Sequence, residues 1–183
     1  MKNGKSIETT RRQAIAGVIM IATGAAMRPS EVWAESEDIS HTAESIHQET
    51  LIKASRKRIF DTLTDTDQFD KVIKVGSGIN TTALGNKPTL ISREPGGSFT
   101  IFGGHIVGRQ IELVPNERIV QCWRVVDWAP GIYSVAKFDL LEQGSATKIV
   151  FDHTGFPKGL GKHLADGWKS HYWEPLEKFL TVS

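Results

Sequence analysis

The sequence has little of the chemistry that short motifs reveal. Its 183 residues include one cysteine, Cys122, so no internal disulfide can form and cysteine usage does not indicate the redox state of the compartment. Cys122 lies in a strand-like run, where we expect a packed and unreactive thiol. The chain also lacks a G-x-S-x-G sequence and a glycine loop followed by Lys-Ser or Lys-Thr. These absences argue against serine hydrolases and nucleotide-dependent enzymes.

An excess of one charge sign is also missing. The chain has 22 basic and 21 acidic residues and a formal charge of +1, which is no signature of nucleic-acid binding. Asp65, Asp67 and Asp70 form an acidic group, which we interpret as caps or flanks of a helix start. His163 and His171 are about 80° apart on an α-helix and therefore share no single face. Because no metal-site spacing occurs, we predict no metal and no cofactor.

A long apolar run is absent too. The uncharged stretch at residues 14–26 has 13 residues, which is too short for a stable membrane span. It lies between a basic head, residues 1–13, and a small-residue exit at Val32-x-Ala34, which together are the parts of a secretory signal. Thr10–Ile15 resembles the twin-arginine export signal, which implies a bacterial chain that folds before it crosses the membrane. We predict a signal peptide at 1–34 and a periplasmic or secreted protein; the alternative is a short amphipathic or disordered tail.

Cleavage after Ala34 would leave 149 residues and remove five basic and two acidic residues, which changes the formal charge from +1 to −2. Residues 35–44 are polar and acidic, and we expect them to form a flexible lead-in. Residues 45–183 are long enough to bury a sizeable core as one domain.

The clearest pattern that is present lies at the carboxyl end. Apolar side chains recur there at steps of four residues, which predicts an amphipathic helix of four to five turns over residues 161–180. This stripe includes two large aromatic residues and requires a partner surface. Its members are Leu164, Trp168, Tyr172, Leu176 and Leu180.

The preceding chain supplies that surface. Ser55 can cap a short helix, Arg56–Thr64, and Asp65 or Thr66 a second short turn. Turn signals separate the remaining strand-like runs, which we place at 45–54, 98–102, 105–114, 118–127, 132–141 and 146–153. The order predicts an α+β fold in which a curved antiparallel sheet of about six or seven strands wraps around the long C-terminal helix. Such a sheet tends to leave a cavity beneath the helix.

Four segments carry a resemblance to a known family. They are Gly97–Gly108, Leu113–Arg124, Trp128–Ser134 and Gly155–Leu176, of which Trp128-x-Pro130-Gly131 and Gly167-Trp168 with the aromatics after it are the most specific. These segments resemble the activator of the 90-kDa heat-shock protein ATPase, a branch of the START-like (SRPBCC) superfamily. The resemblance implies a helix-grip fold over roughly residues 45–180. In eukaryotes the activator binds a cytosolic chaperone, so it also implies a possible protein partner.

Large aromatics with polar groups suit pockets for small apolar molecules, and they dominate the candidate site. Arg109 is included on the condition that it shares the inward parity of Val107 and Ile111, in which case it could bind a ligand carboxylate. We predict no catalytic residue. The pocket candidates are His105, Arg109, Trp123, Trp128, Phe151, His153, Leu164, Trp168, His171 and Tyr172.

Three hypotheses for the function follow. The first is non-enzymatic binding of a small hydrophobic or amphipathic molecule between the C-terminal helix and the sheet. The second, carried by the resemblance, is a protein-binding or chaperone-accessory module. The third is an enzyme similar to the aromatases and cyclases of the superfamily, with His105, His153 or Arg109 in acid–base roles.

Overall fold

The structure is a computed structural model that describes residues 43–76 and 85–182. The predicted signal peptide at 1–34 and residues 35–42 of the predicted lead-in lie outside the described residues. The last two residues of that lead-in belong to the first strand, which begins at Ala43. Within the described ranges, no helix has the length and apolar character needed to cross a lipid bilayer.

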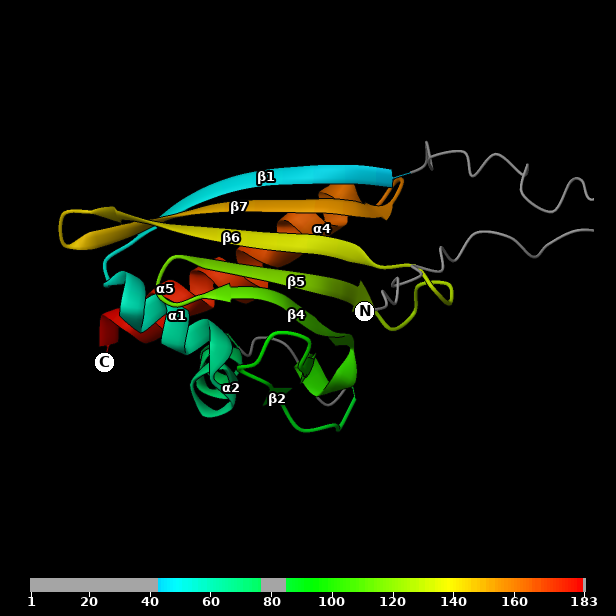
Figure 1. The fold of residues 1–183 in the computed structure, drawn as a ribbon, viewed down its shortest axis with the longest axis horizontal. Coiled ribbons are helices and arrows are strands. Elements are labelled where there is room, and N and C mark those ends of the chain that lie inside the picture. The colour runs from blue at the N-terminus through cyan, green and yellow to red at the C-terminus, as the bar shows by residue number, and fades with distance from the viewer. Residues whose placement is uncertain (1–42, 77–84, 183) are drawn as a thin grey trace, which may run out of the picture. The chain divides into compact units, whose positions relative to one another are not determined.

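A seven-stranded antiparallel sheet forms one layer of the domain (Figure 1). The strand order is β1-β7-β6-β5-β4-β3-β2, so the first strand pairs with the last and the others follow as a meander. The α+β fold predicted from the sequence is confirmed. The strands are β1 Ala43–Ile52, β2 Leu90–Ile91, β3 Ser98–Ile101, β4 Ile106–Val114, β5 Arg118–Val125, β6 Ser134–Gln143 and β7 Ala146–Pro157.

Two short helices follow β1, and their starts are fixed by side-chain caps. The Ser55 hydroxyl accepts a hydrogen bond from the Arg58 backbone N–H at the start of α1, Arg56–Thr64. The Asp65 carboxylate accepts one from the Gln68 N–H at the start of α2, Thr66–Val75. Both caps confirm the sequence prediction. The two helices lie at one end of the sheet, beside the end of the chain (Figure 1).

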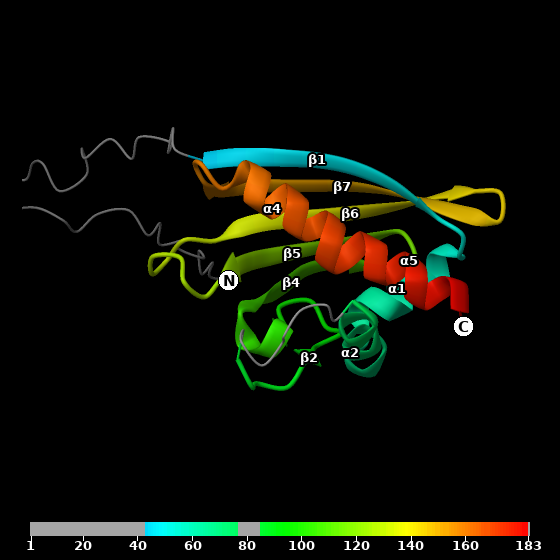
Figure 2. The same cartoon turned by 180° about the vertical axis from the view of Figure 1, so that it is seen from behind.

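The C-terminal helix crosses the concave side of the sheet, as Figure 2 shows from the helix side. It consists of α4 Gly161–Trp168, a π-helical turn η2 Lys169–Trp173 and α5 Glu174–Val182. The five residues of the apolar stripe are all buried. In an ideal α-helix, side chains spaced four residues apart rotate about the helix axis by about 160° over 16 residues. One extra residue in a π turn removes about 100° of this rotation. The π turn therefore keeps the stripe on the sheet.

Strand β4 departs from the predicted alternation. A register shift lies between Gln110 and Glu112, and it leaves Ile111 50% exposed while Gln110 is buried. The inward position before it is Gly108, where an added Cβ would lie 2.1 Å from the Cys122 carbonyl oxygen. These inward positions carry a glycine and a glutamine, which are not hydrophobic. The hydrophobic pattern of the strand therefore pointed to the alternate residues, which face outward before the register shift. The condition on which Arg109 was included in the site, that it faces inward, is not met: Arg109 is exposed and donates to the Gly96 carbonyl.

Candidate functional site

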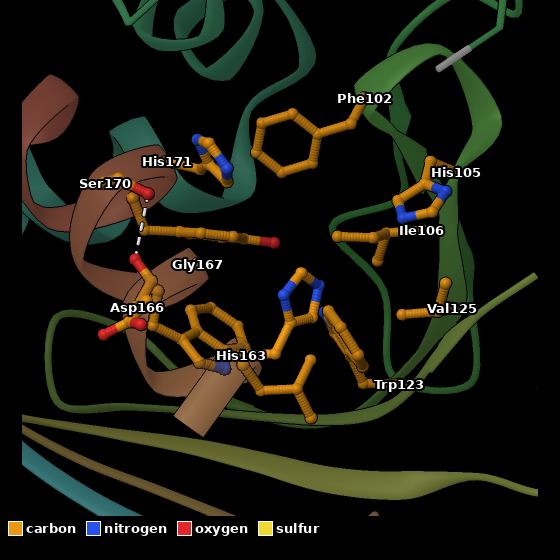
Figure 3. A pocket seen from close by; sticks show the side chains of 13 residues that line it. Phe102, His105, Ile106, Trp123, Val125, His163, Asp166, Gly167, Ser170 and His171 are labelled. Atoms are coloured by element: carbon orange, nitrogen blue, oxygen red, sulfur yellow. Dashed lines mark hydrogen bonds between the residues drawn. The ribbon is translucent and has the colours of Figure 1, made fainter. Parts of the chain in front are cut away.

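A cavity of about 300 Å³ lies between the C-terminal helix and the strands β4 and β5 (Figure 3). The helix contributes its first two turns and part of η2, and a 3₁₀ turn, η1 Phe102–Gly104, contributes the opposite side. Its lining residues are Phe102, His105, Ile106, Trp123, Val125, His163, Leu164, Asp166, Gly167, Trp168, Ser170, His171 and Tyr172.

Aromatic rings form most of the inner wall of the cavity. The Trp168 ring packs between Trp123, at 5.6 Å, and Tyr172, at 4.1 Å, measured between ring centroids. Phe102 lies 5.4 Å from Tyr172 and holds the left-handed backbone φ of 51°, which is rare for a residue with a side chain. Contacts with neighbouring residues must hold this backbone conformation in place. In this conformation the Phe102 ring lines the cavity.

Three polar atoms in this wall are buried without a hydrogen-bond partner among the described residues. They are the Trp123 indole nitrogen Nε1, the Tyr172 hydroxyl and the His171 nitrogen Nδ1. Trp123 is only 2% exposed and Tyr172 only 5%. Burial raises the pKa of Tyr172, so its hydroxyl stays protonated. Most buried polar atoms in proteins are paired, so three unpaired ones around one cavity set this wall apart from the packed interior.

Three histidines also line the cavity. Figure 3 shows His163 and His171 from the helix and His105 from the opposite side. The prediction that His163 and His171 share no single face is wrong, since both line the cavity. His171 lies within the π-helical turn Lys169–Trp173, where each residue rotates less than in an α-helix, so the angle between the two side chains is smaller than about 80°. The pKa of His171 is lowered by burial and by the neighbouring His163. The described residues contain no group of three His, Cys, Asp or Glu side chains that could hold a metal ion.

A second polar arrangement lies behind Trp168 and is fully paired. The Trp168 indole N–H donates to His153 Nδ1 at 2.9 Å, so that nitrogen is the acceptor of a neutral imidazole. His153 Nε2 then donates to the Ser134 hydroxyl at 2.7 Å, and Ser134 donates to the Trp123 carbonyl at 3.0 Å. His153 is 0% exposed, and burial lowers its pKa to about 3. This chain of bonds fixes the rings of the cavity wall.

The structure therefore divides the residues that the sequence predicted for the site. Phe151 and His153 pack behind Trp168, whereas Trp128 packs against Trp123 outside the cavity. Arg109 lies outside as well, for the reason given above. Six candidates do line the cavity: His105, Trp123, Leu164, Trp168, His171 and Tyr172.

Sequence reasoning missed further lining residues, above all Phe102, His163 and Gly167. Phe102 was assigned to the end of a strand, where its left-handed backbone could not be foreseen. For His163 a signal did exist, because the strict i+4 spacing of five apolar residues is longer than the α-helical period and hints at an extra residue in one turn.

Comparisons with known proteins agree with this fold. A family model described as "Activator of Hsp90 ATPase homolog 1-like protein" matches residues 53–181. The chain is 26% identical over 96 residues to the mouse activator of 90 kDa heat shock protein ATPase homolog 2, and 24% identical over 96 residues to the human homolog 1. Each match covers 52% of this chain but only 29% and 28% of the relative, so the chain spans less than a third of the length of these relatives.

Solved structures show the same architecture. An HSP90 activator from Plasmodium falciparum superposes with a TM-score of 0.62 at 20% identity, over 76% of this chain and 96% of that one. The Aha1 dimer from Colwellia psychrerythraea gives a TM-score of 0.58 at 19% identity, over 75% and 96% of the two chains. Since the family model matches well over half of the sequence, the chain belongs to the family of Activator of Hsp90 ATPase homolog 1-like proteins.

Proposed function

We propose that this protein binds a small apolar or amphipathic molecule in the cavity between the C-terminal helix and strands β4 and β5. The observation that carries the proposal is the coincidence of an aromatic cavity of about 300 Å³ with three buried polar atoms in its wall that have no partner within residues 43–76 and 85–182. Small-molecule sites are typically apolar cavities with a few placed polar groups, and this volume is at the lower end of their range.

The cavity can be blocked without removing any core side chain. Gly167 lines it from the helix, and an added Cβ there meets only a ring atom of His171, at 3.9 Å. Leucine is also a better helix former than glycine, so Gly167→Leu should fold at least as well as the parent chain. The matched control is Lys162→Leu, which places the same side chain on an exposed part of the same helix.

Native mass spectrometry of protein purified gently from its own cells tests the proposal. We expect a mass excess of a few hundred daltons over the denatured chain, retained in Lys162→Leu and lost in Gly167→Leu. A bare chain mass for the parent protein, or an excess that Gly167→Leu retains, would count against binding in this cavity.

A second candidate function is that of a protein-binding accessory to a chaperone. It is supported by the family membership and by the likeness to the Plasmodium falciparum HSP90 activator over 96% of that chain. The test is the ATPase rate of an Hsp90-class chaperone from the same cell, measured with and without this protein. An increase that saturates with concentration supports the activity, whereas an unchanged rate with a demonstrably folded protein opposes it.

We further propose that residues 1–34 direct export, on the strength of the basic head, the uncharged span and the Val32-x-Ala34 exit. An exported chain would not meet a cytosolic chaperone, so the location separates the two candidate functions. Cell fractionation should find the cleaved protein outside the cytoplasm, and replacement of Arg11 and Arg12 by lysine should retain it inside. Uncleaved protein in the cytoplasm of the parent strain would contradict export.

A further inference from the structure

The unpartnered atoms of the cavity wall restrict the chemistry of its ligand. An indole N–H can only donate a hydrogen bond, so Trp123 Nε1 requires an acceptor. The Tyr172 hydroxyl remains protonated and can donate as well. The indole of Trp123 lies close enough to this hydroxyl to affect its pKa, yet the two atoms do not meet hydrogen-bond geometry. The Trp123 N–H from β5 and the Tyr172 hydroxyl from η2 therefore lie near each other, and neither has a hydrogen-bond partner among the described residues.

The surroundings of these donors disfavour a strongly charged ligand group. Among the described residues that line the cavity there is no lysine or arginine, so the three histidines are the only basic side chains there that could offset the charge of a carboxylate or phosphate. The one acidic lining residue, Asp166, is exposed, as is His163. The Trp123 N–H and the Tyr172 hydroxyl are neutral donors, which suit a carbonyl, ether or hydroxyl oxygen.

The walls restrict the shape of the ligand. Trp123, Trp168, Tyr172 and Phe102 present aromatic rings to the cavity, and the centroids of the rings that contact one another within this set lie 4.1 to 5.6 Å apart. Rings favour offset or edge-on contact with other rings. A flat molecule of two or three fused rings meets this requirement within about 300 Å³.

We propose that the ligand is a planar, uncharged aromatic molecule whose oxygen accepts hydrogen bonds from the Trp123 indole N–H and the Tyr172 hydroxyl. This inference rests on the proposed small-molecule function and adds the class of molecule. The His171 nitrogen Nδ1, the third atom without a partner among the described residues, is available to a second polar group of the ligand.

Two probes of the same shape test the inference by calorimetric titration. They are 2-acetylnaphthalene, which carries a carbonyl oxygen, and 2-isopropenylnaphthalene, in which a CH₂ group replaces that oxygen. We expect the parent protein to bind the ketone about tenfold more tightly, the combined effect of two neutral hydrogen bonds. In Tyr172→Phe the preference should fall to about threefold, because the ring stays and only the hydroxyl is lost.

The other tyrosine of the chain, Tyr133, supplies the control for Tyr172→Phe. It is 49% exposed and does not line the cavity. Tyr133→Phe should leave the preference unchanged. Equal affinity of the two probes for the parent protein would overturn the acceptor inference and leave the apolar cavity in place. A preference that Tyr172→Phe does not alter would overturn the role of Tyr172. If neither probe binds, this inference fails, and the proposed function is decided by the mass-spectrometric test alone.

Discussion

The space beneath the C-terminal helix has two parts with similar composition and different character. Around His153 the aromatic side chains fill the space, and the indole N–H groups of Trp168 and Trp173 are both paired, with His153 and with Gln48. Around Tyr172 the space is hollow, and the indole of Trp123 has no partner among the described residues. We call these the filled part and the hollow part.

The comparison teaches that aromatic content does not separate core from binding site. Both parts draw tryptophans from the same helix and sheet, and Trp168 contributes to both. What differs is whether the polar atoms on the rings are satisfied within the chain, because a buried donor without an acceptor is costly unless something else supplies one. The proposed site is therefore identified by its unpaired atoms rather than by its rings.

Replacement of Trp168 should produce the largest effect, because this side chain is shared by the two parts. Trp168→Ala removes a 2% exposed indole and leaves the His153 acceptor unpaired, so we expect a loss of about 3–5 kcal/mol in the free energy of unfolding, measured by urea denaturation. Trp128→Ala, at a half-buried indole outside the cavity, is the control and should cost clearly less. Equal losses would show that Trp168 does not link the two parts.

The filled part should also make stability depend on pH. His153 has a pKa of about 3 in the folded chain and about 6.5 when unfolded, so protons bind the unfolded state preferentially between these values. Stability is therefore full above about pH 6.5 and is lost as the pH falls, by about 2–3 kcal/mol at pH 4.5. Urea denaturation from pH 7 to 4.5 measures the loss.

In His153→Gln the loss of stability between pH 7 and 4.5 should be smaller by about 2–3 kcal/mol, because glutamine does not titrate. The same substitution at the exposed His163 is the control for removal of a histidine. If His153→Gln keeps the full pH dependence, the buried imidazole is not its source.

Deleting one hydroxyl group from each part should change the free energy of unfolding least, and it compares the two parts most directly. Ser134→Ala removes a buried hydroxyl that both accepts and donates, so it should cost about 1–3 kcal/mol in the free energy of unfolding. Tyr172→Phe removes a hydroxyl that has no partner among the described residues, so its cost in the ligand-free protein should be within about 0.5 kcal/mol of zero. Similar losses for the two variants would refute the distinction between the parts.

Local signals in the sequence were sufficient for the elements. Ser55 and Asp65 were identified as helix caps because a cap needs only a side chain and an N–H two or three residues away. The apolar stripe of the C-terminal helix was likewise visible as spacing. The sequence did not place strand β2, which is only two residues long. So short an element leaves no periodicity to detect.

The site was only partly predictable. The positions of Arg109 and His163 each depend on one extra residue in a regular element, the bulge in β4 and the π turn in the helix. Such an insertion rotates every side chain beyond it, so periodicity read from the sequence fails on one side of it. Phe102 was missed for a related reason, because its unusual backbone is held by the packing of its ring.

The sequence by itself determined the caps, the succession of elements along the chain and the aromatic stripe that must pack on a sheet, since these follow from neighbouring residues and from hydrophobic spacing. Only the tertiary structure decided which rings are core and which line the cavity. That decision depends on partners far apart in the chain: His153 and Ser134 satisfy each other and Trp168, whereas Trp123 and Tyr172 meet without a hydrogen bond. Pairing over such distances is set by the curvature of the sheet beneath the helix, which no local pattern encodes.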